Sequence, residues 1–196
     1  MASSAKIDTI TNPDSTVSLH NGYPRQPGRI IELLTSPCDG SQVHVASGKY
    51  RLQNVTAAQV TTTTYERITG SLISYVPPIG ATSVQYSFHF NTYWIADHAI
   101  NNYKFYIGEN EVSYARHNRS MRYNEDRTTF EWTIQIGGVT NLANGQLASW
   151  TVPIELYMMV RHYGASNYNN LHGTQYWDGA GSNQLGIPVL TITAFA

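Results

Sequence analysis

A run of alternating side chains at residues 82–94 constrains the fold of this chain more than any other feature. One parity is apolar and the other is polar: Val84, Tyr86, Phe88, Phe90 and Trp94 alternate with Gln85, Ser87, His89, Asn91 and Tyr93. Successive side chains of a strand point to opposite faces, whereas a helix would scatter these rings around its circumference. The run therefore predicts a long central strand whose apolar face packs against a second sheet.

Further strand signals surround this run at roughly ten-residue spacing. They cover residues 29–35, 42–46, 49–54, 59–67, 68–76, 103–107, 111–115, 128–136, 147–163 and 186–196. Turn residues separate them, and no helix signal is longer than one turn. This pattern is typical of an all-β fold, an antiparallel β-sandwich or a barrel. Long strands, with one ending at the last residue, favour a jelly roll over an immunoglobulin-like sandwich.

The composition argues against several classes of function. Charged residues make up 13% of the chain, and the formal net charge is −1, so no overall field attracts nucleic acid. The N-terminal residues lack the apolar segment of a signal peptide, and no apolar run is long enough to span a membrane. We therefore expect a chain that is made in a cytoplasm, with no membrane or nucleic-acid partner. Its one cysteine, Cys38, is expected to be an unreactive thiol.

The first 28 residues differ from the rest. Pro13, Gly22, Pro24, Pro27 and Gly28 interrupt a polar sequence. Because proline fixes φ and lacks a backbone donor, we expect residues 1–28 to form an extended arm without strands, and residues 29–196 to form the β-sandwich domain. The arm is either a flexible tail or a segment that orders against a partner protein. Its candidate contacts are Ile7, Ile10, Val17 and Leu19.

At residues 68–94, 103–115 and 130–136, and in the terminal apolar strand, the chain resembles the TNF/C1q-like trimeric jelly rolls. Those in the surface and fibre proteins of tailed phages and large DNA viruses are the most similar. The resemblance covers residues 29–196 through strand order and aromatic placement, and it includes no diagnostic motif. It implies a virion protein that forms a homotrimer and binds other virion or capsid proteins through residues 1–28.

The sequence offers no arrangement of residues typical of catalysis or metal binding. Its seven histidines show no close ligand spacing, and no glycine-rich phosphate loop or nucleophile elbow is present. We therefore expect no enzyme activity, no metal and no cofactor. A jelly-roll enzyme would need a pocket lined by histidines and carboxylates.

Two features could contact a partner. Residues 116–127 hold Arg116, Arg119, Arg122 and Arg127, whose guanidinium groups suit anions. The alternative is a solvated loop whose charge is neutralised by Glu125 and Asp126. The second feature is an aromatic set near predicted loops, Trp94, Trp150, Tyr168, Tyr176 and Trp177, which either stacks on a host surface glycan or belongs to the core. Trp94 and Trp132 are expected in the core, and Trp177 remains open.

The terminal strand carries apolar side chains on both parities. Leu190 and Ile192 lie on one parity and Phe195 on the other, and a strand that is apolar on both faces is normally covered on both. We expect one parity to pack in the core and the other to contact another copy. The sequence thus predicts a self-associating virion protein for capsid decoration, a fibre or a pentameric vertex. A lectin-like carbohydrate-binding module is the alternative.

Overall fold

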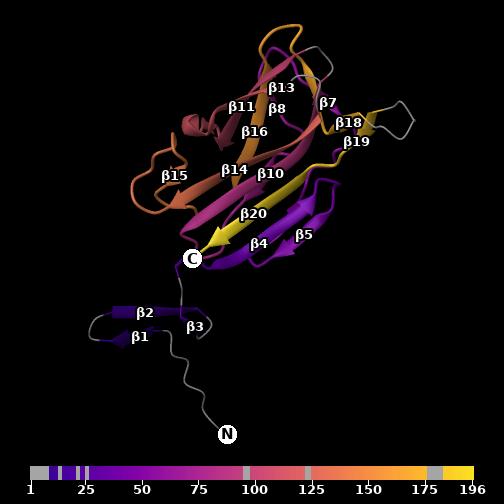
Figure 1. Cartoon of the computed structure of the whole chain (residues 1–196). Helices are drawn as coiled ribbons and strands as arrows, with labels where there is room; N and C mark the ends of the chain where they lie inside the picture. Colours follow the sequence, from indigo (N-terminus) through magenta and orange to yellow (C-terminus); the bar gives the residue numbers. More distant parts are fainter. Residues whose placement is uncertain are drawn as a thin grey trace.

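The computed structural model describes residues 9–12, 15–20, 23–24, 27–94, 98–121, 125–175 and 183–196, with side chains from residue 27 onward except those of Trp94, Gln175 and Asn183. Nearly all of it is strand (Figure 1). The strands are β1 Thr9–Asn12, β2 Ser15–His20, β3 Tyr23–Pro24, β4 Ile30–Pro37, β5 Gln42–Val45, β6 Gly48–Arg51, β7 Gln59–Val60, β8 Glu66–Arg67, β9 Ile73–Tyr75, β10 Ser83–Trp94, β11 Ala99–Ile107, β12 Asn110–Glu111, β13 His117–Met121, β14 Glu125–Ile136, β15 Gln146–Leu147, β16 Ile154–His162, β17 Asn169–Leu171, β18 Gly173–Gln175, β19 Asn183–Leu185 and β20 Val189–Phe195. One 3₁₀ turn, Ser113–Ala115, follows β12.

Strand β10 is the centre of the first sheet, as the alternation of its side chains predicts. On one edge it pairs with β14 from Ser83 to Tyr93. On its other edge, residues Ser83–His89 pair with β20, and β20 pairs with β4. At the C-terminal end of β10, residues Thr92–Trp94 pair on that same edge with β17 instead. We call this assembly, with β7 and β15, the β10 sheet.

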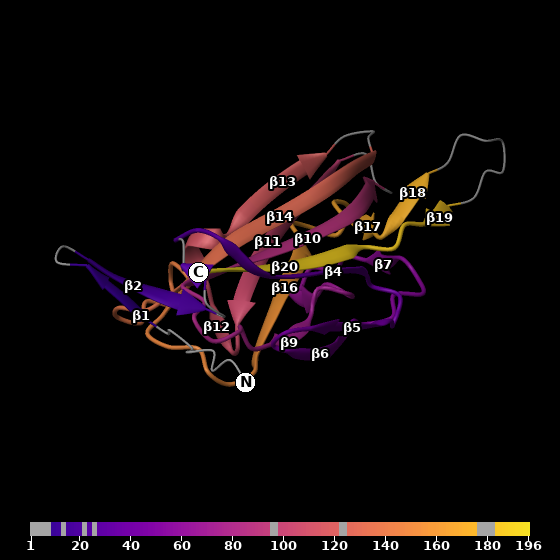
Figure 2. The ribbon, with the colours of Figure 1, turned by 90° about the horizontal axis from the view of Figure 1, so that it is seen from below.

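The second sheet is built on β11 and packs against the first (Figures 1 and 2). Strand β11 pairs with β16 on one edge and with β12 and β13 on the other, and β16 also pairs with β8 and β9. Every pairing in both sheets is antiparallel except the short one between β14 and β15. The prediction of an all-β sandwich is confirmed, whereas the connectivity of a jelly roll stays a prediction.

The core lies between these two sheets. The apolar parity of β10 supplies Val84, Tyr86, Phe88 and Phe90, which are at most 1% exposed. They face side chains of the β11 sheet such as Phe105, whose ring centroid lies 4.9 Å from that of Tyr86. Each buried ring removes a large apolar area from water, so this interior supplies the main driving force of folding.

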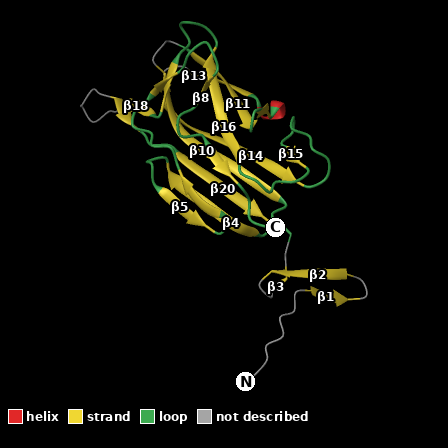
Figure 3. Ribbon diagram, turned by 180° about the vertical axis from the view of Figure 1, so that it is seen from behind, coloured by secondary structure: helices red, strands yellow, loops and turns green. Residues whose placement is uncertain are grey.

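Three local predictions were wrong. Residues 9–12, 15–20 and 23–24 form a small three-stranded antiparallel sheet in place of an extended arm without strands (Figure 3). Residues 59–67 form only the two short strands β7 and β8, because threonine hydroxyls bond locally to the backbone, as Thr62 Oγ1 does to the carbonyl of Thr64 at 2.9 Å. Residues 117–121 of the expected polar loop form β13, because the His117 ring stacks on Tyr103 and Met121 is buried.

Candidate interaction surfaces

The outer face of the β10 sheet consists mainly of short uncharged side chains. The four cross-strand rows between Ser83 and His89, read from β14 to β4, are Gln135–Ser83–Phe195, Thr133–Gln85–Thr193–Leu33, Glu131–Ser87–Thr191–Thr35 and Thr129–His89–Val189–Pro37. Beyond them the register of β10 with β14 continues with Arg127 opposite Asn91 and Glu125 opposite Tyr93. Glu131 bears the only formal charge in the four described rows. Hydroxyls bond across the strands, as in the 2.8 Å contact between Thr35 Oγ1 and Thr191 Oγ1. Leu33 is 53% exposed at the β4 margin of this face.

The terminal strand β20 divides its two parities between the core and this outer face. Leu190 and Ile192 are fully buried within the subunit, so they are removed from the candidate oligomer interface. Phe195, on the other parity, is only partly buried and belongs to the outer face. The two sides of β20 thus have different roles, and Phe195 alone of the three remains an interface candidate.

The outer face of the β11 sheet carries tyrosines and cations that contact one another. The Tyr106 and Tyr157 rings stack with centroids 5.1 Å apart, and the Arg67 guanidinium lies 4.2 Å from the Tyr157 centroid. Lys104 Nζ lies 4.2 Å from the Tyr65 centroid, and the Arg161 guanidinium lies 5.2 Å from it. Cations over ring faces are attracted by the ring quadrupole, so these side-chain contacts stabilise the surface of the sheet.

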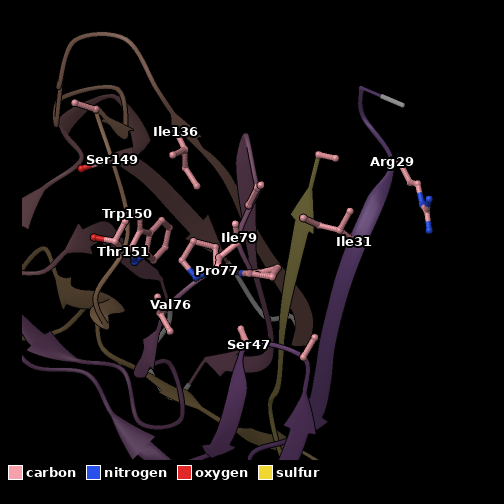
Figure 4. Close-up of a pocket in the computed structure, with 16 residues that line it drawn as sticks. Arg29, Ile31, Ser47, Val76, Pro77, Ile79, Ile136, Ser149, Trp150 and Thr151 are labelled. Atoms are coloured by element: carbon pink, nitrogen blue, oxygen red, sulfur yellow. The ribbon is translucent and has the colours of Figure 1, made fainter. Parts of the chain in front are cut away.

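An apolar groove of about 840 Å³ lies at the end of the sandwich where the chain terminates (Figure 4). Its lining is Arg29, Ile31, Ala46, Ser47, Val76, Pro77, Pro78, Ile79, Gly80, Ala81, Ile136, Ala148, Ser149, Trp150, Thr151 and Ala196. Trp150 and Pro77 lie together on its floor, whereas the Arg29 side chain points away from them. The groove therefore presents an uncharged apolar surface.

One lip of the groove carries the isoleucine Ile79 at 92% exposure. It follows two prolines and precedes Gly80, whose φ is +92°, a conformation that favours glycine. Proline fixes its own φ, so this turn holds Ile79 outward at low entropic cost. Sequence analysis treated the turn only as the end of a strand. The available signal was an apolar side chain at the tip of a Pro-Pro-Ile-Gly turn.

A buried carboxylate network lies behind the groove. Glu32, 6% exposed, accepts hydrogen bonds from the Tyr75 hydroxyl at 2.6 Å and from the Ser47 backbone amide at 2.7 Å. Burial and the neighbouring carboxylate raise the pKa of Tyr75. These contacts satisfy the carboxylate oxygens, so the network has a structural role.

Two arginines of the basic segment, Arg116 and Arg119, form ion pairs with carboxylates. Arg119 forms an ion pair with Asp126 and donates to Thr128 Oγ1 at 3.2 Å. Arg116 pairs with Glu111, which also receives Lys104 at 3.0 Å, and these contacts lower the pKa of Glu111. Arg122 lies outside the described residues. The pairing of Arg119 favours the neutralised alternative over an anion site, although the partner that neutralises Arg116 was not expected.

The structure describes the side chains of two members of the aromatic set, Trp150 and Tyr168. Trp150 is buried at 5% exposure and donates from Nε1 to the Tyr75 carbonyl at 3.2 Å. Trp132 was predicted to lie in the core; it is partly buried and packs against the edge of that core. Trp177, Tyr176 and the side chain of Trp94 lie outside the described part of the chain. Tyr168 is partly exposed, and its ring centroid lies 6.3 Å from that of His162. Of the described candidates, Trp150 is therefore assigned to the core and Tyr168 is not.

Histidines are distributed over the sandwich rather than gathered. Within the described ranges no group of three or more His, Cys, Asp or Glu side chains could hold a metal ion. His172 is fully buried at φ 64° against the rings of Phe88 and Phe90, and burial lowers its pKa to about 4. Burial also raises the pKa of the Cys38 thiol to about 12, as expected of an unreactive cysteine.

The arm candidates fall on the small sheet. Ile10 lies on β1, and Val17 and Leu19 lie on β2, whereas Ile7 is outside the described residues. The register pairs Ile10 with Val17 and Leu19 with Pro24. Residues directly opposite in an antiparallel pair share a face, so these four positions lie on one face of the small sheet.

Neither a family model nor a curated protein matches this chain. The part of the chain that the structure describes contains no helix that could span a membrane. The resemblance to TNF/C1q-like jelly rolls therefore stays a prediction.

Proposed function

We propose that this protein is a self-associating structural component of a virion, a TNF/C1q-like jelly roll that assembles as a homotrimer in capsid decoration, a fibre or a vertex. The observation that carries the proposal is the outer face of the β10 sheet. The part of this face where β10 pairs with both β14 and β20, the four rows from Ser83 to His89, holds a single formal charge, on Glu131. Interfaces are depleted of charged side chains at their centre, and a face that meets its own copies avoids like charges.

The margins of this face supply the apolar contacts that such an interface needs. Leu33 is 53% exposed on β4, and Phe195 is partly exposed on β20. Leu33 pairs with Thr193, two residues before Phe195, so the two side chains lie in neighbouring rows. The viral context comes from the resemblance, with the arm as the attachment segment to other virion proteins.

The carbohydrate-binding alternative has less support. A sugar would stack on an exposed ring face, but the Tyr157 ring already contacts Tyr106 and Arg67, and Tyr65 lies beneath Lys104. The apolar groove is lined by no carboxylate and no histidine, so a hydrolytic role has no acid–base pair in that pocket to support it.

Sedimentation of the full chain tests the proposal. We expect the natural sequence to sediment as a trimer at micromolar concentration, and Leu33→Asp to sediment as a folded monomer. Tyr163→Asp is the matched control, because Tyr163 is 75% exposed and follows β16 in the other sheet. A monomeric natural chain, or a Leu33→Asp variant that assembles like the control, would contradict the proposal.

A further inference from the structure

We propose that the outer edge of β14 pairs, antiparallel and about a two-fold axis, with the same edge of a second copy. Strand β14 lies at the margin of the β10 sheet opposite to β4 (Figure 1). The inference goes beyond the proposed function, because backbone groups at this margin make the contact, whereas the proposed trimer uses side chains on the outer face near β4 and β20.

The backbone of β14 presents an open strand edge. The Ile136 amide donates to the Thr82 carbonyl on the β10 side, and the Gln135 amide donates to the Gly145 carbonyl on the other side. Because backbone groups alternate in direction along a strand, the odd-numbered residues of β14 point their N–H and C=O groups away from β10. Among the described strands, only β15 pairs on that side, at Gln135 and Ile136. Residues 127–133 are therefore open to another strand.

This edge lacks the features that protect the opposite edge of the sheet. Strand β4 ends in Pro37, its pairing with β20 shifts register between Ala194 and Phe195, and its Glu32 accepts a hydrogen bond from the Ser47 amide of the β5–β6 hairpin. Strand β14 contains no proline or glycine and pairs with β10 without a register shift. An edge without proline, bulge or cover is prone to pair with another chain.

Two side chains of opposite charge on this edge favour a partner with the same sequence. Arg127 and Glu131 are exposed, lie on one face of β14 and are two residues away from Thr129 in either direction. In the described part of the chain Arg127 forms no ion pair. Glu131 accepts a hydrogen bond from Ser87 at 3.2 Å through Oε1, and its Oε2 remains for a guanidinium.

These charges select one register. Only odd-numbered residues can exchange backbone hydrogen bonds with the second copy, so they must lie opposite one another. A two-fold axis at Thr129 places each Arg127 opposite Glu131 of the second copy, and the ion pair forms twice. Axes at residues 127, 128 or 131 oppose like charges, and an axis at residue 130 places both charges opposite threonines. The axis at Thr129 is therefore the favoured one.

The contact is expected to be weak in dilute solution. A single strand edge buries less area than the interface of a stable complex, and its backbone groups exchange bonds to water for bonds to protein. The pairing should therefore form where copies are concentrated, between subunits of neighbouring assemblies, and be captured by a covalent link at high protein concentration.

Cysteine cross-linking of the full chain tests the register. In Thr129→Cys the two cysteines meet at the axis with Cα atoms about 5.5 Å apart, within the roughly 4.4–6.8 Å that a disulfide spans. We expect mild oxidation to give a 129–129 disulfide, identified by mass spectrometry, while the fully buried Cys38 stays reduced. The matched control is Thr133→Cys, on the same face, whose copies lie about 27 Å apart in this register. A disulfide at 133, or none at 129, overturns the inference.

Charge reversal tests the ion pairs. In the Thr129→Cys background, Arg127→Glu alone and Glu131→Arg alone oppose like charges and should each lower the disulfide yield about tenfold. An equal mixture of these two variants should restore the yield, because the mixed pair opposes Arg and Glu at both positions. Lys49→Glu, at an exposed position on β6, is the control for the change in net charge and should have no effect. Single variants that link normally, or a mixture that stays low, overturn the inference.

A variant of the proposed trimer face separates the two proposals. Leu33→Asp, which should dissociate the trimer, should leave the 129–129 disulfide in place. Loss of the disulfide in Leu33→Asp overturns the inference, since the cysteines then meet only within a trimer. A monomeric natural chain whose Thr129→Cys variant still links overturns the proposed function alone, and a trimer without the link overturns this inference alone.

Discussion

On the outer face of the β11 sheet, tyrosine rings and cations contact one another, whereas the outer face of the β10 sheet consists of hydroxyls, amides and a few apolar side chains. Tyr157 lies between Tyr106 and Arg67, so that surface is stabilised within one subunit. The other face has one carboxylate in four rows, and its apolar margins at Leu33 and Phe195 remain partly open. Two faces of one sandwich thus differ in whether their contacts are complete within the subunit, and the self-association proposed above uses the incomplete one.

The largest effect is expected across β20, where the two parities can be compared directly. Ile192→Asp places an unpaired charge in the core and should cost about 4 kcal/mol or more of unfolding free energy, enough to prevent folding. Phe195→Asp should leave a folded subunit that no longer assembles. Circular dichroism and sedimentation measure the two effects. The comparison fails if Phe195→Asp unfolds the chain or if it assembles normally.

Lowering the pH should reduce the stability of the fold through the buried His172. The pKa of His172 is lowered from 6.5 to about 4 by burial, which outweighs the opposing influence of the Thr69 backbone. The unfolded chain therefore takes up the proton first, and stability that is complete above pH 6.5 is lost as the pH falls toward 4, by about 3 kcal/mol. Urea unfolding at pH 7.5 and pH 4.5 measures this loss.

The control for acid sensitivity is His172→Asn, because asparagine tolerates a positive φ and does not titrate. Burial also lowers the pKa of His117, so the variant should retain part of the pH dependence. An unchanged loss of stability in His172→Asn would show that His172 is not the group responsible.

A smaller effect is expected on the outer face of the β11 sheet. Tyr157→Ala removes the stack with Tyr106 and the contact with Arg67, and it should cost about 1–2 kcal/mol of unfolding free energy. Association should not change, because this face is complete within the subunit. Thermal unfolding and sedimentation are the measurements, with Tyr114→Ala, at a 71% exposed tyrosine, as the matched control. Loss of assembly in Tyr157→Ala would reverse the assignment of the two faces.

The smallest effect concerns the basic segment. Arg119→Ala should lower stability by at most about 0.5 kcal/mol, since its partly exposed pair with Asp126 is screened by solvent. Association should stay within twofold of the natural chain. A clear fall in binding to an anionic virion partner would restore the anion-site hypothesis.

The sequence predicts those parts of the fold in which one strand carries the whole signal. The alternation in β10 is sufficient, because a half-buried strand needs only period two. The threonines at 61–64 mislead, since strand propensity does not register hydroxyls that bond to their own backbone. The small N-terminal sheet was missed because prolines lie between or at the ends of its described strands.

The candidate surfaces could be predicted only in part. The groove joins Ile31, Pro77, Ile136 and Trp150, which lie far apart in the chain, so no local pattern contains it. The contacts between cations and rings on the β11 sheet likewise join Tyr65, Lys104 and Arg161, which come from three separate segments. Both parities of β20 looked apolar, and only pairing with β10 assigns Ile192 to the core and Phe195 to the surface.

The division of one edge of β10 between two partners has a consequence for local unfolding. Strand β20 pairs with the N-terminal part of β10, Ser83–His89 (below Asn91), and the three-residue β17 pairs with its C-terminal part, Thr92–Trp94 (above Asn91). At the junction the His172 amide donates to the Asn91 carbonyl at 2.7 Å, and Gly186 leaves no room for a Cβ beside the Asn91 side chain. The backbone amides on this edge should therefore exchange with solvent deuterium in two tiers, with early exchange above Asn91 and late exchange below it.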